Sequence, residues 1–416
     1  MSWMLLATNI CNILIQYHIL VSGAVQGYDV DTVCSDNQAL VQLPGGQQLC
    51  LNTELNGFVP YGDIDCGSEV LSIRSFHIER EAYVAIADRD NDAVLIYKWH
   101  DQTFIYHQTI DVPAVLSLEI FRIHNDTYLG TAAYRTGSID TLYQIVQIVG
   151  LQILTQPVIY KWKENESTFI EFQRLNVLEA KTLKFVEFSQ SRDITKYFLI
   201  ATNGSYANTT LYEWDSDGFG VVHHLHAKSK HVAFIQENYQ FWMILTSDRG
   251  TTVWKWTGQH FYVLKSASIN LKAPDSVSLD TANFHHITFI CMVDKRRQLP
   301  VYITKWHSEQ EQFILVENLK HHHATTCQFV NYAGQLYLLT GSRLGANIYK
   351  YDQVFNNFHL IDELDGISHV TATEHVNING VLYLLLKVKS RQYTNDGRVS
   401  DVCRYYQGQL VFLNAG

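Results

Sequence analysis

The stretch that decides the fold runs from residue 83 to residue 108 and reads Tyr83-Val-Ala-Ile-Ala-Asp-Arg-Asp-Asn-Asp-Ala-Val-Leu-Ile-Tyr97-Lys98-Trp99-His-Asp-Gln-Thr-Phe104-Ile-Tyr-His-Gln. An aromatic residue opens an apolar run, a polar turn follows, and a Tyr-Lys-Trp centre then precedes a phenylalanine. This order predicts antiparallel strands that carry aromatic side chains on one face. The centre recurs as Tyr160-Lys-Trp162, Tyr212-Glu-Trp214, Trp254-Lys-Trp256, Thr304-Lys-Trp306, Tyr349-Lys-Tyr351 and, in degenerate form, Cys403-Arg-Tyr405.

The recurrence predicts the architecture. Copies at a period of roughly 40–60 residues, each with four strand-like runs, are typical of a β-propeller. An aromatic residue opens every copy: Tyr83, Tyr128, Tyr197, Phe241, Phe289, Tyr337 and Tyr383. An apolar residue follows the last aromatic of each centre by five or seven positions: Phe104, Phe169, Phe219, Phe261, Phe313, Phe358 and Leu410. The two spacings differ by two residues. Because side chains alternate faces along a strand, a change of two keeps that apolar residue on the buried face. We therefore predict an all-β, seven-bladed propeller.

The motif resembles the repeat of the EAR family, also called epilepsy-associated or epitempin (EPTP) repeat proteins. The resemblance extends over about residues 71–416 and rests on the seven copies quoted above. It implies a secreted or membrane-tethered extracellular protein whose seven-bladed propeller binds other cell-surface proteins. A leucine-rich or laminin-G-like module is not recognisable before the repeats, so the partner of any one relative does not carry over.

Composition and charge agree with this class. Charged residues make up 17% of the chain and aromatic residues 12%, which suits many short sheets packed face to face. The formal net charge is −10. Nucleic-acid binding needs a basic surface, so we expect no nucleic-acid partner.

The first 70 residues divide into two predicted segments. Residues 1–24 are typical of a signal peptide, with an apolar run from Met4 to Val21 and small residues after it. The run lacks a preceding lysine or arginine and contains polar residues, so an uncleaved signal anchor is the alternative. Residues 25–70 form a cysteine-containing segment with little periodicity, and the propeller is expected to start at residue 71. No later stretch is long and apolar enough to cross a bilayer.

Six cysteines follow the leader: Cys34, Cys50, Cys66, Cys291, Cys327 and Cys403. In a secreted chain they predict three disulfides. Three of them precede residue 71, so complete pairing requires at least one bridge between that segment and the propeller. The alternative is that Cys291 and Cys403 are unpaired and fill space in buried strands. The chain has no C-x-x-C pair, so zinc or thioredoxin-like chemistry is not expected.

Four N-x-[ST] sequons also fit an extracellular protein. They begin at Asn125, Asn165, Asn203 and Asn208. All four fall in predicted turns, where a glycan would protrude from the protein. We expect at least two of them to be glycosylated.

Motifs for catalysis or cofactor binding are absent from the sequence. The serine elbow, the P-loop, H-E-x-x-H and the dinucleotide fingerprint are all missing, so we predict no catalytic residues, no metal site and no cofactor. Residues 246–253 resemble an Asp-box turn, which marks a folding turn rather than a reaction centre. The carboxylates of Asp88, Asp90 and Asp92 alternate as calcium ligands do. A glycine kink and a distal acidic ligand are lacking there, so we favour a solvated turn.

Two further sets of polar residues have competing interpretations. Histidines cluster at 223–226 and 321–323; they would suit a metal or a pH sensor, but both clusters end a strand and we favour ordinary loop histidines. The residue between the paired aromatics is basic in six copies: Lys98, Lys161, Lys255, Lys305, Lys350 and Arg404, with Glu213 the exception. We favour cations whose stems pack between sheets. The alternative is a basic ring that attracts an acidic ligand.

One stretch breaks the repeat. Tyr128 and Trp162 are 34 residues apart, against 14 to 22 in the other copies. The excess at 137–156 is mostly apolar, and its residues at helical spacing are candidates for partner binding: Leu142, Ile145, Val149 and Ile153. A helix packed on the propeller, a partner-binding element and an artefact of the gene model all remain open.

These observations favour a secreted propeller that binds a cell-surface or extracellular-matrix protein through its rim loops and is not an enzyme. The first alternative is a carbohydrate-binding or glycan-hydrolysing propeller. The second is a structural component of an extracellular coat. An enzyme would place coupled titrating groups near the channel mouth, whereas a binder would expose an apolar patch at the rim.

Overall fold

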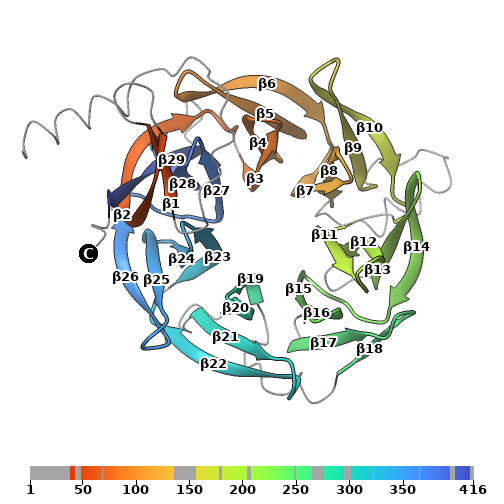
Figure 1. The fold of residues 1–416 in the computed structure, drawn as a ribbon. Helices are drawn as coiled ribbons and strands as arrows, with labels where there is room; N and C mark the ends of the chain where they lie inside the picture. The colour runs from red at the N-terminus through yellow and green to blue at the C-terminus, as the bar shows by residue number, and fades with distance from the viewer. Residues whose placement is uncertain are drawn as a thin grey trace, which may run out of the picture.

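The computed structural model describes residues 38–42, 48–67, 69–134, 156–177, 180–203, 208–247, 250–264, 276–294, 301–321, 323–364, 366–393 and 399–412. These residues form seven antiparallel sheets arranged radially around a central channel (Figure 1). The predicted all-β, seven-bladed propeller is therefore confirmed. Within the same ranges, no helix is long and apolar enough to cross a membrane.

Six blades are four-stranded sheets whose strands follow one another in the chain, with the first strand of each nearest the channel. Blade 1 contains β3 (Val70–Ile78), β4 (Glu81–Asp88), β5 (Ala93–His100) and β6 (Thr103–Asp111); blade 2 contains β7 (Val115–Ile123), β8 (Asp126–Ala133), β9 (Val158–Lys163) and β10 (Thr168–Arg174); blade 3 contains β11 (Thr182–Ser189), β12 (Thr195–Thr202), β13 (Thr209–Asp215) and β14 (Gly218–Leu225). Blade 4 contains β15 (His231–Glu237), β16 (Gln240–Ser247), β17 (Gly250–Trp256) and β18 (Phe261–Val263); blade 5 contains β19 (Ser276–Phe284), β20 (Ile287–Asp294), β21 (Val301–His307) and β22 (Gln312–Leu319); blade 6 contains β23 (Ala324–Tyr332), β24 (Gln335–Ser342), β25 (Ala346–Asp352) and β26 (Asn357–Leu364).

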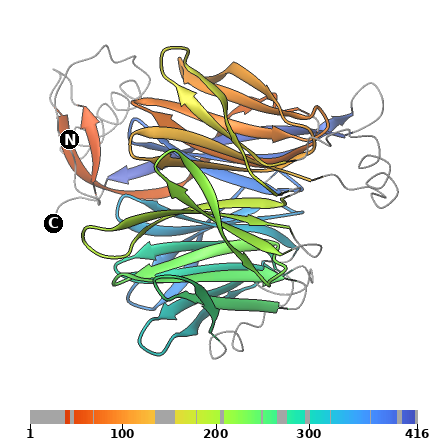
Figure 2. The same cartoon turned by 90° about the vertical axis from the view of Figure 1, so that its right-hand side faces the viewer.

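The seventh blade is built from both ends of the chain. Its inner strands are β27 (Ala372–Ile378), β28 (Val381–Tyr393) and β29 (Val399–Phe412), and its outer strands are β2 (Gln48–Ile64) and β1 (Gln38–Gln42). β2 pairs antiparallel with β29 along the edge of the sheet (Figures 1 and 2). The predicted start of the propeller at residue 71 therefore needs correction, because the segment before it supplies the outer strand of blade 7.

Register identifies β2 as the equivalent of the outer strand in the other blades. Phe58 lies opposite Gly408, just as Phe104 lies opposite Trp99 in blade 1. Three residues after each phenylalanine the outer strand has a β-bulge, at Tyr61 and at His107. A bulge strengthens the local twist and hinders edge-to-edge pairing of exposed strands.

A hydrogen bond from the neighbouring blade gives the same assignment. The backbone N–H of Phe58 donates to Asp362 Oδ2 at 2.6 Å. In blade 6 the backbone N–H of Phe358 donates to Glu317 Oε2 at 2.8 Å. Each acceptor lies in the outer strand of the preceding blade, so the closing strand is held as an internal outer strand is.

Two assignments from the sequence change as a result. The seventh copy of the motif is Tyr406-Gln407-Gly408, not Cys403-Arg404-Tyr405, because Tyr383 lies opposite Gln407. Its apolar partner is Phe58 rather than Leu410. A Cβ added at Gly408 would lie 2.7 Å from Leu55 Cδ1, so glycine at this position leaves room for the side chains of β2.

In blades 3 and 4 the opening aromatic lies one residue later in the chain than the sequence analysis assigned it. Phe198 lies opposite Glu213 and Trp242 lies opposite Lys255, which is the register that Tyr83 has with the first lysine of the motif. Adjacent aromatics at 197–198 and 241–242 made the two positions indistinguishable by pattern. The assignments of Tyr197 and Phe241 were therefore wrong by one position.

The aromatic residues form one contact that repeats between blades. The opening aromatic of a blade packs against the last aromatic of the next centre, with ring centroids 4.9–5.5 Å apart. We call these contacts the aromatic layer: Tyr83–Trp162, Tyr128–Trp214, Phe198–Trp256, Trp242–Trp306, Phe289–Tyr351 and Tyr383–Trp99. Tilted and edge-on ring pairs of this kind add to the free energy gained by burying the rings.

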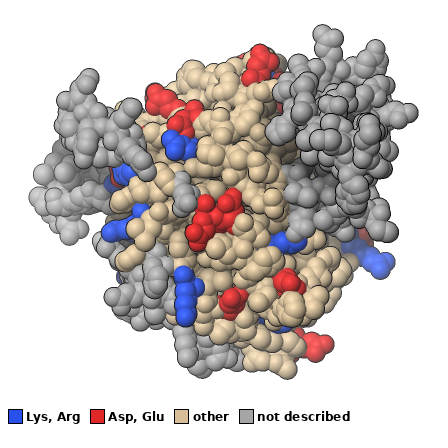
Figure 3. Space-filling model, turned by 90° about the vertical axis from the view of Figure 1, so that its left-hand side faces the viewer, with Lys and Arg blue, Asp and Glu red and all other residues tan. Residues whose placement is uncertain are grey.

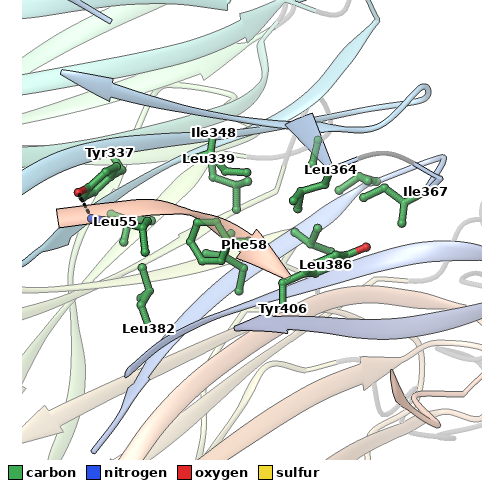
Figure 4. Close-up of a cluster of buried hydrophobic side chains, with 14 of the residues drawn as sticks. Leu55, Phe58, Tyr337, Leu339, Ile348, Leu364, Ile367, Leu382, Leu386 and Tyr406 are labelled. Carbon is green, nitrogen blue, oxygen red and sulfur yellow. Dashed lines mark hydrogen bonds between the residues drawn. The ribbon is translucent and has the colours of Figure 1, made fainter. Parts of the chain in front are cut away.

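The interface between blades 6 and 7 departs from this contact because Gly408 has no ring. There Leu55 and Phe58 of β2 join the cluster that contains Tyr337 and Tyr406 (Figure 4). The backbone N–H of Leu55 donates to the Tyr337 hydroxyl at 3.3 Å. The closing strand thus fills the space that an aromatic fills elsewhere.

Two disulfides lie within the described ranges. Cys66 follows β2 and is bonded to Cys403 of β29, across a sequence separation of 337 residues. Cys291 of β20 is bonded to Cys327 of β23 and joins blades 5 and 6. The interpretation of Cys291 and Cys403 as unpaired core cysteines was therefore wrong. Cys34 lies outside the described residues.

Candidate functional site

Seven equivalent residues of the innermost strands line up at one level of the channel. Each of the seven pairs with a residue of the second strand of its blade. That residue lies two positions after the opening aromatic. We call this set the channel ring: Arg74, Glu119, Lys184, Ala233, Asp280, Gln328 and Glu374. Unlike the aromatic layer, the ring has a different residue type in almost every blade.

Part of the channel ring is a charge network. The Arg74 guanidinium lies between Glu119, at 3.8 Å, and Glu374, at 3.5 Å. Lys184 Nζ lies 3.4 Å from Glu119 Oε1. Both glutamates are buried. A buried carboxylate is tolerated when cations and hydrogen bonds compensate its lost hydration, and this network supplies both.

Each acidic member of the ring also bonds to the innermost strand of the next blade. The backbone N–H of Phe185 donates to Glu119 Oε1 at 3.0 Å, and that of Phe329 donates to Asp280 Oδ2 at 2.8 Å. The Glu374 carboxylate accepts from the hydroxyl of Ser75 at 3.4 Å. These carboxylates therefore join neighbouring blades, which is a structural role.

Asp280 differs from the two glutamates because both of its neighbours in the ring are uncharged. Loss of hydration inside the protein raises the pKa of its carboxyl, and the N–H of Phe329 and the charges of Lys184 and His375 only partly oppose this rise. Its neighbour in the ring on one side is Ala233 and on the other Gln328. The folded protein therefore favours a neutral Asp280 more than an unfolded chain does.

The basic residues of the motif are paired with carboxylates. Lys98 lies 2.6 Å from Glu81, and Lys161 lies 2.7 Å from Asp126. Each ammonium also lies over the opening tyrosine of its blade. A basic ring free to attract an acidic ligand is not supported, because nearby acids offset these charges.

The exceptional Glu213 belongs to a charge-swapped version of the same pair. Lys196 occupies the position that Glu81 has in blade 1, and its Nζ lies 2.5 Å from the Glu213 carboxylate. The ammonium of Lys196 lies 5.9 Å from the centre of the Phe198 ring. Blade 3 therefore keeps both the ion pair and the cation–π contact with the two charges exchanged.

Several of the other polar candidates have internal partners. Asp88 accepts from the backbone N–H of Glu69 at 3.3 Å, and Asp92 accepts from that of Ala114 at 2.6 Å. The buried His321 has Nδ1 2.6 Å from the Thr340 hydroxyl. Across the described ranges, no group of three or more His, Cys, Asp or Glu side chains is arranged to hold a metal ion.

The sequons differ in exposure. Asn125 lies in the turn between β7 and β8, Asn165 in the turn between β9 and β10, and Asn208 just before β13; all three are exposed. Asn203, at the end of β12, is only 7% exposed, which disfavours a glycan on its side chain. The partner-binding candidates Leu142, Ile145, Val149 and Ile153 lie outside the described residues.

Sequence reasoning missed three apolar residues in the turns of blade 6. Leu344 follows β24 and is 74% exposed, and Val354 and Phe355 follow β25 with 86% and 75% exposed. They are the three most exposed large apolar side chains among the described residues. Aligning the turns of the repeats would have revealed them. The outer side formed by β2 and β26 carries scattered charges of both signs on largely uncharged surface (Figure 3).

The fold and this surface define an all-β, seven-bladed propeller in which two turns of blade 6 expose large apolar side chains. No family model matches the chain. It is 22% identical over 299 residues to "Leucine-rich repeat LGI family member 2" of Homo sapiens, covering 69% of this chain and 50% of that protein. The Mus musculus protein of the same name is 22% identical over 302 residues, covering 71% and 50%. The chain thus spans about half the length of the curated relatives it matches.

The EAR repeats of this relative form a seven-bladed propeller, so the predicted resemblance is confirmed at the level of distant homology. Among solved structures, the crystal structure of Saccharomyces cerevisiae Sqt1 aligns with a TM-score of 0.50 and 13% identity. The alignment covers 84% of this chain and 88% of that one. A likeness of this kind concerns the fold alone.

Proposed function

We propose that the chain is a secreted propeller that binds a protein of the cell surface or extracellular matrix through its rim turns. The observation that carries the proposal is the placement of Leu344, Val354 and Phe355. All three project from turns of a rigid scaffold rather than from strands. Val354 and Phe355 are adjacent in one turn, and exposed apolar side chains that lie together are the kind that marks an interface.

Two further observations support an extracellular protein. The Cys66–Cys403 and Cys291–Cys327 disulfides suit an oxidising compartment. The sequons at Asn125, Asn165 and Asn208 have exposed side chains. Distant homology to the LGI family points in the same direction.

The test is a binding screen of the secreted protein against a panel of purified cell-surface ectodomains. We expect at least one ectodomain to bind saturably to the folded protein and not to the reduced, denatured protein. A variant that lacks residues 138–155 tests the sequence-based candidate element at 137–156 in the same screen. Absence of protein binding, together with hydrolysis or capture of glycans, would favour the carbohydrate-active alternative instead.

A further inference from the structure

Most outer strands of the propeller have a feature that hinders pairing with another molecule. β6, β10, β14, β22 and β26 each have a register shift against the strand beside them, which marks a β-bulge. The extra residue in each lies three positions after the phenylalanine near the start of the strand: His107, Phe172, Val222, Val316 and Ile361. β18 has only three residues. A bulge twists an edge strand and so protects its unpaired N–H and C=O groups from a second strand.

The outer edge of blade 7 lacks this protection. β1 is the outermost of its five strands, and it pairs with β2 over five consecutive residues without a register shift. Its sequence, Gln-Ala-Leu-Val-Gln, contains no charged residue and no proline. Within the part of the chain that the structure describes, no strand pairs with the other edge of β1. A regular, uncharged edge of this kind is one to which a further strand can add.

The position of β1 leaves room for an added strand. β2 pairs with β29 only from Thr53 onward, where Thr53 lies opposite Phe412, and its residues 48–52 pair with β1. The β1–β2 hairpin therefore extends past the described end of β29, and it lies at one side of the propeller (Figure 2). A strand that adds to β1 approaches from the perimeter. It leaves the central channel and the register between β2 and β29 unchanged.

The sequence of β1 is complementary to itself in antiparallel pairing. A two-fold axis at Leu40 places position 38 opposite position 42 of a second copy, and position 39 opposite position 41. Glutamine then faces glutamine, alanine faces valine, and Leu40 faces its own counterpart. No two like charges meet, and side-chain amides can donate to and accept from one another. Such a contact uses the same patch on both copies and closes as a dimer.

We infer that the outer edge of β1 is a dimerisation edge, and that its occupant is β1 of a second copy of this chain, antiparallel about Leu40. The inference goes beyond the proposed function and does not depend on it, because the rim turns of blade 6 take no part. A pair of five-residue strands is small beside a standard protein interface. We therefore expect a dimer that dissociates at micromolar rather than nanomolar concentration.

The experiment is sedimentation equilibrium of the purified protein over about 1–100 µM. The test variant combines Gln38→Lys with Gln42→Lys, and the matched control combines Gln38→Lys with Gln42→Glu. In the antiparallel register the test variant places ammonium opposite ammonium at both ends of the strand, whereas the control places ammonium opposite carboxylate. The test variant should dimerise roughly tenfold more weakly than wild type, and the control at least as tightly as wild type. An equimolar mixture of the test variant with Gln38→Glu/Gln42→Glu should dimerise again.

Three outcomes overturn the inference. A wild-type protein that sediments as a monomer over the whole range refutes the dimerisation edge. A wild-type dimer that the test variant retains unchanged is formed by another surface. Equal weakening in the test variant and the control excludes the antiparallel register, because parallel strands would place like charges together in both. Thermal melts of each variant separate loss of pairing from loss of folding, and the binding screen against ectodomains judges the proposed function independently.

Discussion

The aromatic layer and the channel ring occupy equivalent positions in all seven blades, yet they differ in how far they repeat. In the aromatic layer one contact recurs at 4.9–5.5 Å in six interfaces, and β2 fills the seventh. In the channel ring the same register carries three acids, two bases, an amide and an alanine. The repeated aromatic contact therefore holds neighbouring sheets together. The channel ring, by contrast, gives the blades different charges at one level of the channel.

The largest expected effect comes from emptying the aromatic layer. Replacing Trp162 of the layer by alanine should cost about 3–5 kcal/mol of unfolding free energy, because it removes a large buried ring. The same holds for Phe358, which lies in an outer strand and packs against Tyr351 of the layer. Replacing Phe58 should cost a similar amount if β2 is equivalent to the other outer strands. Chemical denaturation of the secreted variants measures this, with the exposed Phe355→Ala as control. A Phe58→Ala protein that unfolds like wild type would show that the closing strand is not equivalent to the other outer strands.

Alkaline pH should weaken the aromatic layer before it affects the ring. Burial is the main cause that raises the pKa of Tyr128 in the layer to about 12, from 10.0, and burial likewise raises the pKa of Tyr83 and Tyr383. The unfolded chain therefore ionises first, so stability is intact below pH 10 and falls as the pH rises toward 12. Each tyrosine accounts for up to about 3 kcal/mol of this loss. Absorbance of tyrosinate should rise together with loss of sheet signal; ionisation at pH 10 without unfolding would contradict the burial.

Within the channel ring, two carboxylates should respond in opposite ways. The raised pKa of Asp280 means that its contribution to stability is present in acid and is lost as the pH rises. Asp280→Asn should therefore melt like wild type near pH 3 and higher than wild type at neutral pH, by about 1 °C per kcal/mol gained.

Glu119→Gln is the contrasting variant at the ring. It removes a buried charge that the partly exposed Arg74 and Lys184 share and should cost about 1–3 kcal/mol at neutral pH. Thermal melts of both variants across this pH range separate the two roles. A neutral-pH loss of stability in Asp280→Asn would contradict the account of the ring.

The smallest effect concerns the charge-swapped pair of blade 3. Glu213→Lys alone places two ammonium groups together and should cost about 0.2–1 kcal/mol. Adding Lys196→Glu restores the arrangement found in blades 1 and 2 and should recover most of that loss. A double-mutant cycle measures the coupling; a coupling of zero would mean that the repeated ion pairs do not contribute.

Features that repeat in every blade could be predicted from the sequence, whereas features found in a single blade could not. The blade count and the aromatic layer were predictable because the motif is local and recurs. The role of β2 was not, because Phe58 pairs with Gly408 at the far end of the chain and its surroundings lack the motif. Phe198 and Trp242 were missed by one position because each adjoins a second aromatic residue.

The candidate site was less predictable still. The members of the channel ring have no common residue type, so only the register of the sheets reveals that they share a level. The turn at 353–356 was visible in the sequence, but its meaning depends on the exposure of Val354 and Phe355. Exposure of a turn residue is set by packing of the whole blade, which the pattern alone does not contain.

The most direct test of the account is disulfide mapping of the secreted protein under non-reducing conditions. The central claim is that a strand from the start of the chain closes the blade formed by its end. We expect linked peptides that contain Cys66 with Cys403 and Cys291 with Cys327, because these pairs are bonded across the closure and across blades 5 and 6. A bridge from Cys66 to Cys34 or Cys50, or a free Cys403, would contradict the closure.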